Sequence, residues 1–183
     1  MKTILIHGKD TYPQDKWYPW FSKKMNELNI DCIVPKLPEP ENPDINCWLS
    51  EITKTEPDED SILIGHSRGG VAILRWLEKM PDSKKVKKVI LVAANSGKSN
   101  NTTLPETNKG FYSDRGYNFE VMQKHCNCFV VFHSEDDKRV PFAEGEENAK
   151  GLNATFYTFT DKGHFGKALG EFPELVDEVV KKD

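Results

Sequence analysis

The sequence of 183 residues has no long apolar run. Its longest, residues 89–94, is far shorter than the roughly 20 residues that a membrane-spanning helix needs. A secretion signal is not expected either, because the apolar start at residues 1–6 gives way at once to polar residues at 7–10. We therefore expect no membrane association and a cytoplasmic location.

Cysteine and excess positive charge are also scarce. The chain has 4 cysteines, Cys32, Cys47, Cys126 and Cys128, and without a signal peptide we interpret them as reduced thiols rather than a disulfide framework. The formal net charge of -4 gives no basic surface that would attract nucleic acid, so no nucleic-acid partner is expected. The one lysine cluster, within residues 84–88, is interpreted as a solvated surface edge.

No internal repeat, low-complexity tract or hinge-like linker divides the chain. Its length suits one domain with a sizeable core and is short for two independent ones. We therefore expect a single domain over residues 1–183.

Short apolar runs alternate with segments of helical period, a pattern typical of a parallel sheet covered by helices. The expected strands are residues 3–7, 31–34, 61–65, 86–93, 128–133 and 155–160. Three sets of apolar residues at helical spacing are expected to face the core: Trp17, Trp20, Phe21 and Leu28; Ile73, Trp76, Leu77 and Met80; and Phe172, Leu175, Val176 and Val179. The sequence thus predicts an α/β fold, a three-layer α/β/α sandwich with a mostly parallel sheet.

The sharpest motif is Gly-x-Ser-x-Gly at residues 65–69, between an expected strand and a helical segment that starts near Val71. This strand-turn-helix context is the one in which the motif presents a nucleophilic serine. Side chains at positions 65 and 69 would collide with the neighbouring strand and helix, which explains the glycines. The pattern therefore indicates Ser67 as a nucleophile beside a helix start, where backbone N–H groups can stabilise an oxyanion.

A serine nucleophile needs a base, and the base needs an orienting carboxylate. In proteins with this motif the order along the chain is Ser, acid, His, and of the five histidines only His164 follows both Ser67 and a plausible acid. The acid should follow the expected strand at 128–133. Asp137 is preferred because the turn that leads to a helix at Pro141 would fix its carboxylate, with Asp136 next and Glu135 last.

Two N–H groups must converge on the oxyanion, and one should come from the loop after the first strand. We expect the backbone N–H of Lys9 and that of Arg68 to supply the pair. The His7 side chain is expected to support the loop.

Five segments in order are similar to the small α/β-hydrolases related to retinoblastoma-binding protein nine, especially their bacterial members. They are Ile-His-Gly at 6–8, Trp-Tyr-Pro-Trp at 17–20, Gly-His-Ser-Arg-Gly at 65–69, Asp-Asp-Lys-Arg-Val-Pro at 136–141 and Gly-His-Phe at 163–165. The resemblance covers essentially the whole chain. It implies a compact α/β-hydrolase fold without a large cap, a triad of Ser67, Asp137 and His164, and a serine hydrolase or carboxylesterase. From the complete and correctly ordered set of triad residues we expect hydrolysis of small esters, with thioesters or amides as alternatives, through an acyl-Ser67 intermediate and without a cofactor.

The Leu-x-Cys-x-Glu sequence that gave the mammalian relative its name is absent here. A retinoblastoma-type partner is therefore not carried over, and the protein partners of this chain are left open. An alternative function is a protein-binding module on a hydrolase scaffold, with an idle triad.

Two other kinds of site are weighed and disfavoured. A zinc ion could use His125, Cys126, Cys128 and His133, but an extended strand over 128–133 would hold its ends about 16 Å apart. The glycine pair at 69–70 is not followed by the Lys-Ser or Lys-Thr of a phosphate loop. No metal and no nucleotide are expected.

Aromatic residues expected at the same end of the sheet are the candidates for substrate contact. Trp17, Tyr18 and Phe165 are assigned to substrate binding, while Phe111 and Tyr112 are expected on a loop at that end. Core packing is at least as plausible for the tryptophan. The polar segment 95–109 leaves a central strand at its C-terminal end and is expected to border the site, which we expect to be shallow and to favour short acyl groups.

Overall fold

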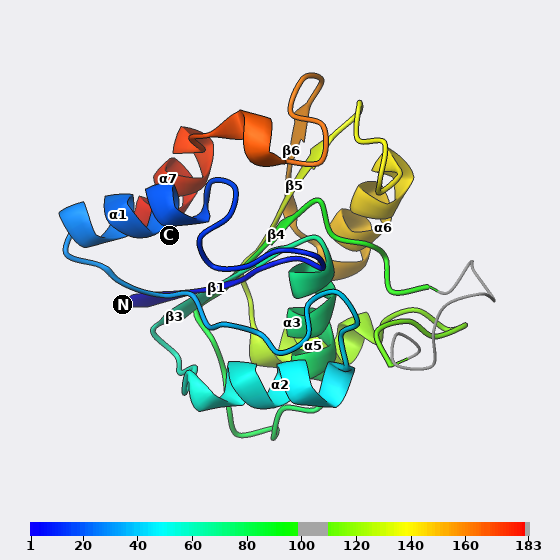
Figure 1. The fold of residues 1–183 in the computed structure, drawn as a ribbon. Coiled ribbons are helices and arrows are strands. Elements are labelled where there is room, and N and C mark those ends of the chain that lie inside the picture. The colour runs from blue at the N-terminus through cyan, green and yellow to red at the C-terminus, as the bar shows by residue number, and fades with distance from the viewer. Residues whose placement is uncertain (99–109, 182–183) are drawn as a thin grey trace.

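The computed structural model describes residues 1–98 and 110–181 and contains one six-stranded sheet in these ranges (Figure 1). The strand order is β2-β1-β3-β4-β5-β6, and every pair of neighbouring strands is parallel. The strands are β1 (Lys2–Ile6), β2 (Asp31–Ile33), β3 (Ser61–His66), β4 (Lys88–Val92), β5 (Phe129–Ser134) and β6 (Thr155–Phe159). The expected parallel sheet is confirmed, and its strands end within two residues of the expected limits.

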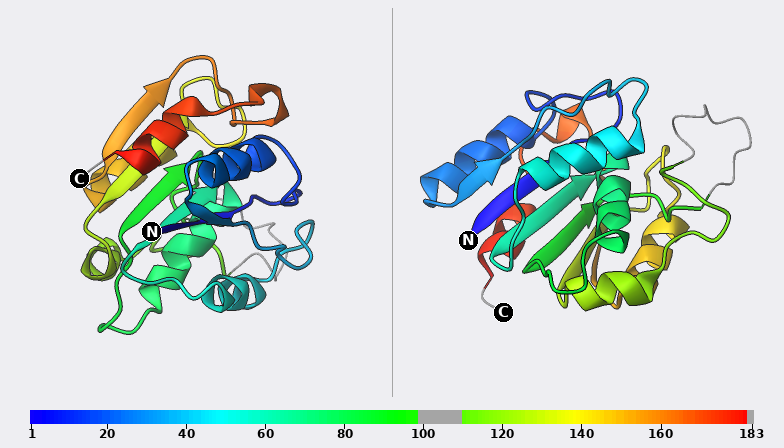
Figure 2. Two further views of the ribbon diagram at one scale, coloured as in Figure 1. Left: turned by 90° about the vertical axis from the view of Figure 1, so that its left-hand side faces the viewer. Right: turned by 90° about the horizontal axis from the view of Figure 1, so that it is seen from below.

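Helices cover both faces of the sheet, which makes three layers (Figures 1 and 2). One face packs against α1 (Tyr18–Glu27) and α7 (Pro173–Val180). The other packs against α2 (Ile45–Lys54), α3 (Arg68–Glu78), α5 (Phe119–His125) and α6 (Phe142–Leu152). A short 3-10 helix, η1 (Lys167–Leu169), precedes α7.

The central strands are apolar on both sides because both faces of the sheet are covered. All residues of β3, β4 and β5 are buried. One expected core residue, Leu28, is instead 47% exposed. Since α1 ends at Glu27 and Leu28 is its C-cap, the side chain of Leu28 no longer follows the helical spacing that keeps Phe21 and Met25 inside.

The sheet places the ends of β1 and β3 side by side at the point where the chain changes direction. From β1 the chain crosses to one side to form β2, and then returns to form β3 on the other side. Ligands in open α/β sheets bind outside the carboxyl ends of the strands at such a switch point. The pairing of Ile6 with Gly65 brings the segments that follow, residues 7–9 and 66–69, to the same edge.

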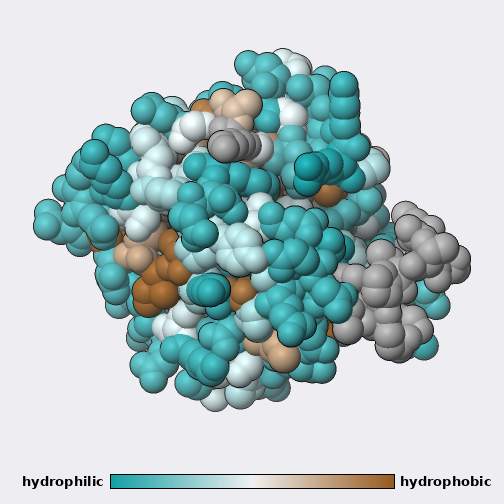
Figure 3. Space-filling model, viewed as in Figure 1, coloured by the Kyte–Doolittle hydropathy of each residue, from teal (hydrophilic) through white to brown (hydrophobic). Residues whose placement is uncertain are grey.

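Hydrophilic side chains dominate the face of the molecule shown in Figure 3, and the apolar areas on it are small. This agrees with a chain in which 30% of residues are charged. Among the described helices none is both long and apolar enough to cross a membrane.

Candidate active site

Ser67 stands between β3 and α3, in a backbone conformation that few non-glycine residues adopt. Its φ of 53° and ψ of -121° lie outside the ordinary regions, and a residue held there costs on the order of 1–3 kcal/mol. Its N–H donates to the carbonyl oxygen of Val92 at 2.8 Å, which anchors the turn to the next strand. The expected strand-turn-helix context of the motif is present.

Two glycines allow this turn to exist. A Cβ atom on Gly69 would lie 2.1 Å from the carbonyl oxygen of Ile6, and one on Gly65 would lie 2.4 Å from the Cα atom of Gly70. Both neighbours are backbone atoms, which cannot rotate away. The first helical turn of α3 can therefore pack directly on β1 and β3 only with glycine at these positions.

His164 lies in the loop after β6 and contacts both Ser67 and Asp137. Its Nδ1 is 2.8 Å from Oδ2 of Asp137, and its Nε2 is 3.0 Å from Oγ of Ser67. A carboxylate can only accept, so Nδ1–H donates to Asp137 and Nε2 accepts from the Ser67 hydroxyl. The structure thus brings the three residues of the expected triad together in one hydrogen-bonded chain, in the orientation that general-base activation of a serine requires.

Asp137 is held by its own turn. Its Oδ1 accepts the N–H of Arg139 at 2.8 Å and that of Val140 at 3.1 Å, and its side chain has no exposed surface. Burial raises the pKa of Asp137, but the hydrogen bonds from His164 and the two backbone amides outweigh it and hold the pKa below its ordinary value. The carboxylate is therefore ionised and fixed in direction.

The two competing carboxylates occupy other places. Glu135 is exposed. Asp136 is also exposed, and its Oδ1 accepts the Gly163 N–H at 2.8 Å and the Ser134 hydroxyl at 2.5 Å. Asp136 thus holds the backbone beside His164, while Asp137 contacts the imidazole itself.

The loop after β1 presents its backbone to Ser67. A Cβ atom on Gly8 would lie 3.3 Å from Cβ of Ser67. The Gly8 carbonyl oxygen accepts from Nδ1 of His7 at 3.0 Å and from the Thr11 hydroxyl at 2.8 Å. Because C=O and N–H point in opposite directions across a trans peptide, the Lys9 N–H is directed away from His7 and Thr11. As expected, His7 supports this loop.

Arg68, the other expected oxyanion donor, is the first residue of α3. Its backbone N–H therefore belongs to the turn at the positive end of the helix dipole. Its guanidinium carbon lies 5.0 Å and 4.8 Å from the ring centroids of Phe111 and Tyr112. The Arg68 side chain therefore packs on these two rings, on the described part of the loop that was expected at this end of the sheet.

The three residues expected to contact substrate do not line the site. Trp17, Tyr18 and Phe165 are all fully buried and belong to the core between α1, α7 and the sheet. A side chain without exposed surface cannot line an open pocket, so we replace this assignment with a packing role. The segment 95–109 was expected to border the site; its residues 99–109 lie outside the described residues.

His66 is a residue of the site that sequence reasoning missed. It is fully buried, with Nδ1 2.7 Å from the hydroxyl of Tyr18 and Nε2 2.9 Å from the carbonyl oxygen of His164. Its ring centroid is 5.1 Å from that of His164. In the sequence it is merely the variable position before the serine, and nothing in the pattern indicates that it contacts residues 48 and 98 positions away.

The candidate zinc ligands lie at opposite ends of β5: His125, Cys126 and Cys128 precede the strand, and His133 is its next-to-last residue. His125 ends α5 before the strand, whereas His133 is near its other end, with Nε2 3.1 Å from the carbonyl oxygen of Val140. In the described part of the chain, no group of three histidines, cysteines or carboxylates is placed to hold a metal ion.

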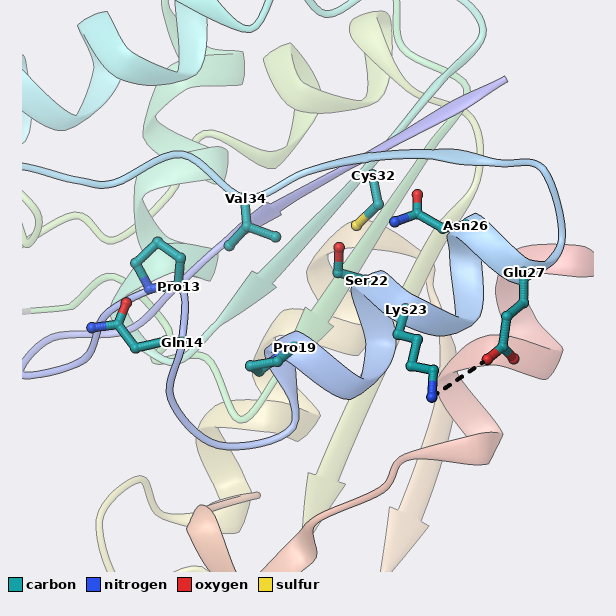
Figure 4. A pocket seen from close by; sticks show the side chains of 9 residues that line it. All are labelled: Pro13, Gln14, Pro19, Ser22, Lys23, Asn26, Glu27, Cys32 and Val34. Carbon is teal, nitrogen blue, oxygen red and sulfur yellow. Dashed lines mark ion pairs between the residues drawn. The ribbon is translucent and has the colours of Figure 1, made fainter.

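Two cavities lie apart from the hydrogen-bonded triad. One of about 880 Å³ lies against α1 and the edge strand β2 (Figure 4), and its lining includes Ser22, Cys32 and the ion pair of Lys23 with Glu27 at 3.9 Å. The other, of about 840 Å³, is lined largely by residues of α2 and α3 and the segments that follow them. Neither is lined by Ser67, Asp137 or His164.

Known proteins resemble this chain over most of its length. A family model described as serine hydrolase matches residues 3–179. Serine hydrolase RBBP9 of Rattus norvegicus is 34% identical over 167 residues, which are 90% of this chain and 84% of that one. The putative hydrolase YdeN of Bacillus subtilis (strain 168) is 28% identical over 168 residues, covering 90% of this chain and 85% of that one. The crystal structure of the ydeN gene product matches with a TM-score of 0.85 and 23% identity, covering 98% of this chain and 97% of that one.

Proposed function

The chain belongs to the serine hydrolase family, among the α/β-hydrolases related to RBBP9, and we propose that it is a carboxylesterase that cleaves small esters through an acyl-serine intermediate. One observation carries the proposal: the continuous hydrogen-bonded chain from Asp137 through His164 to Ser67. Each contact has the donor direction that lets the imidazole accept the serine proton. We propose no cofactor, because this chemistry needs only the three side chains and two N–H groups.

In acylation, Oγ of Ser67 attacks the ester carbonyl carbon while its proton passes to Nε2 of His164. The carbonyl oxygen becomes an oxyanion, which the N–H groups of Lys9 and Arg68 stabilise. The C–O bond to the alcohol then breaks, and His164 returns the proton to the departing oxygen. The products of this half-reaction are the free alcohol and acyl-Ser67.

In deacylation, water takes the place of the alcohol. His164 removes a proton from the water, whose oxygen attacks the acyl carbon, and collapse of the second tetrahedral intermediate releases the carboxylic acid and restores the Ser67 hydroxyl. Throughout, Asp137 keeps the Nδ1–H tautomer of His164 and stabilises the imidazolium. Its fixed, ionised carboxylate suits this role.

We propose short acyl chains as substrates. The His164 side chain is 10% exposed and Ser67 is partly exposed, so an ester can reach them from solvent. Beneath them the site is filled by the buried rings of Trp17, Tyr18 and His66, which leave no deep cleft for a long chain in that direction.

The test is the rate of hydrolysis of the 4-nitrophenyl esters of acetate, butyrate and octanoate. Wild type should cleave the acetyl and butyryl esters fastest, and Ser67→Ala should lose this activity. Ser50→Ala, an exposed serine on α2, is the matched control and should keep it. Octanoate as the best substrate would overturn the size preference, and equal rates for wild type and Ser67→Ala would overturn the mechanism and favour a binding module with an idle triad.

A further inference from the structure

A chain of buried hydrogen bonds joins the two loops that flank Ser67. The Tyr18 hydroxyl lies 2.7 Å from Nδ1 of His66 and accepts the Gly8 N–H at 3.4 Å. On its other side, Nε2 of His66 lies 2.9 Å from the carbonyl oxygen of His164. The chain therefore runs from the loop after β1 to the loop after β6, through the residue that precedes the nucleophile.

The chemistry of the partners fixes the direction of every bond in this chain. The His164 carbonyl can only accept, so the proton of His66 is on Nε2, and Nδ1 must accept from the Tyr18 hydroxyl. Burial lowers the pKa of His66 well below its ordinary value, and the cation of Lys16 adds to this. Burial likewise raises the pKa of Tyr18 and keeps the phenol protonated. His66 therefore has a single neutral tautomer.

Both ends of the chain are backbone groups on which catalytic geometry depends. At one end, Gly8 precedes the Lys9 amide. At the other end, the loop of His164 passes through left-handed backbone, with φ of 52° at Gly163 and 46° at Phe165. A non-glycine residue persists in that region only when its surroundings hold it there, so this loop requires firm anchoring.

We propose that His66, oriented by Tyr18, is a positioning residue. It fixes the position of the His164 loop after β6 relative to the loop after β1, residues 7–9, which carries the Lys9 N–H. The proposal rests on the proposed function, since both loops carry groups of that mechanism. It goes further by giving an orienting role to two side chains that are buried and never touch substrate. A misplacement of about 1 Å in such a constellation can cost on the order of 100-fold in rate.

A role in packing alone makes the opposite prediction for matched variants. His66 is surrounded by aromatic rings, with centroid distances of 6.0 Å to Trp17 and 5.8 Å to Tyr18. If only packing mattered, His66→Phe would be the better replacement. If the hydrogen bond to the His164 carbonyl matters, His66→Gln would be better, because its amide N–H can still donate.

The first test is kcat and KM for 4-nitrophenyl acetate in Tyr18→Phe, His66→Phe and His66→Gln. We expect kcat to fall about tenfold or more in the first two with little change in KM, and His66→Gln to retain at least about threefold more kcat than His66→Phe. Tyr157→Phe is the control, because it removes a hydroxyl that donates to Glu178 at 2.9 Å and has no part in the bonds that join Gly8, Tyr18, His66 and His164. Its kcat should be that of wild type.

The outcomes separate this proposal from the proposed function. If wild type shows Ser67-dependent turnover but His66→Phe equals or exceeds His66→Gln, positioning by His66 is overturned and the esterase assignment stands. If wild type shows no turnover, the assignment fails and nitrogen NMR of the histidine rings decides the positioning. We expect His66 to be protonated at Nε2 only, and the His164 ring signals to move in Tyr18→Phe but not in Tyr157→Phe. Unmoved His164 signals in Tyr18→Phe would overturn the proposal.

Discussion

Asp136 and Asp137, adjacent in sequence, hold two different parts of the same loop. Oδ1 of Asp136 accepts the backbone N–H of Gly163, and Oδ2 of Asp137 accepts Nδ1–H of His164, both at 2.8 Å. One carboxylate thus fixes the path of the loop and the other fixes the ring that the loop carries. The two carboxylates differ because of the turn that follows β5. Its backbone amides at Arg139 and Val140 bind the Asp137 carboxylate inside the protein, whereas Asp136 is exposed.

The first prediction concerns these two carboxylates. Asp137→Asn should lower kcat by about 10³-fold to 10⁴-fold, because an amide in its place favours the wrong tautomer of the imidazole. Asp136→Asn keeps an oxygen that can accept the Gly163 N–H, so its kcat should fall by about tenfold at most. Steady-state kinetics of both variants checks this, and the acid is misassigned if Asp136→Asn is the inactive one.

The second prediction concerns the stability of the turn around Ser67, residues 65–70. In Gly69→Ala the new methyl would meet the Ile6 carbonyl oxygen at 2.1 Å, so the free energy of unfolding should fall by about 3 kcal/mol or more. Gly166→Ala is the control, since a Cβ atom there meets nothing within 4 Å and its φ is -83°. Its unfolding free energy should change by about 1 kcal/mol or less. Urea unfolding measures both, and equal effects of the two substitutions would refute the packing argument.

The third prediction concerns the stability of the fold against pH. His7, His66 and His133 are buried, and burial lowers the pKa of each. Below their unfolded-state pKa of about 6.5, the unfolded chain binds protons that the folded chain does not, so the unfolding free energy decreases as pH falls. As pH falls from 6.5 toward the folded-state pKa of a histidine, that histidine lowers the unfolding free energy by up to about 1.4 kcal/mol per pH unit. The midpoint of urea unfolding should therefore decrease when the pH is lowered from 7.5 to 5.5. The decrease should be smaller in His66→Gln, which has one buried imidazole fewer. A midpoint that stays constant over this range would contradict burial of neutral imidazoles.

The fourth prediction concerns the oxyanion loop. Thr11→Val removes the hydroxyl that donates to the Gly8 carbonyl with almost no change in shape. The Gly8–Lys9 peptide should then tilt more freely. Complete removal of one oxyanion donor lowers kcat by about 10²-fold to 10³-fold, so a donor that is only displaced should lower kcat by about tenfold. Thr55→Val, which removes a similar bond to the Ile52 carbonyl at the end of α2, should leave kcat unchanged. Equal kcat for Thr11→Val and wild type would exclude this role of the loop.

Much of the fold could be predicted because its signals are local. The buried strands are largely continuous apolar runs, and the turn around Ser67 has glycine at positions 65 and 69, where a Cβ atom would meet backbone atoms. Helix α2 was missed although its buried residues Ile45, Trp48, Leu49 and Ile52 have helical spacing, and although Asp44 caps its first turn by accepting the Cys47 N–H at 3.0 Å. The signals for this helix are therefore local, because both the spacing and the cap lie within residues 44–52.

Other features could not be predicted because they depend on contacts across the fold. Trp17 donates its Nε1–H to the Phe165 carbonyl oxygen at 3.1 Å, across 148 positions of sequence. From the sequence alone, an aromatic residue that follows the first strand can equally be a substrate contact or a core residue. Only the packing of α1 on the sheet shows that Trp17 belongs to the core. The contacts of His66 depend in the same way on the fold, because they join it to Tyr18 on α1 and to the carbonyl oxygen of His164.

Labelling with a fluorophosphonate probe tests most directly whether Ser67 is an activated nucleophile. The serine oxygen attacks phosphorus and fluoride leaves, so intact mass should show one adduct on wild type. We predict this adduct on wild type and on Ser50→Ala, and its absence on Ser67→Ala. A folded wild type that acquires no adduct, or a Ser67→Ala variant labelled as fully as wild type, would contradict catalysis through Ser67.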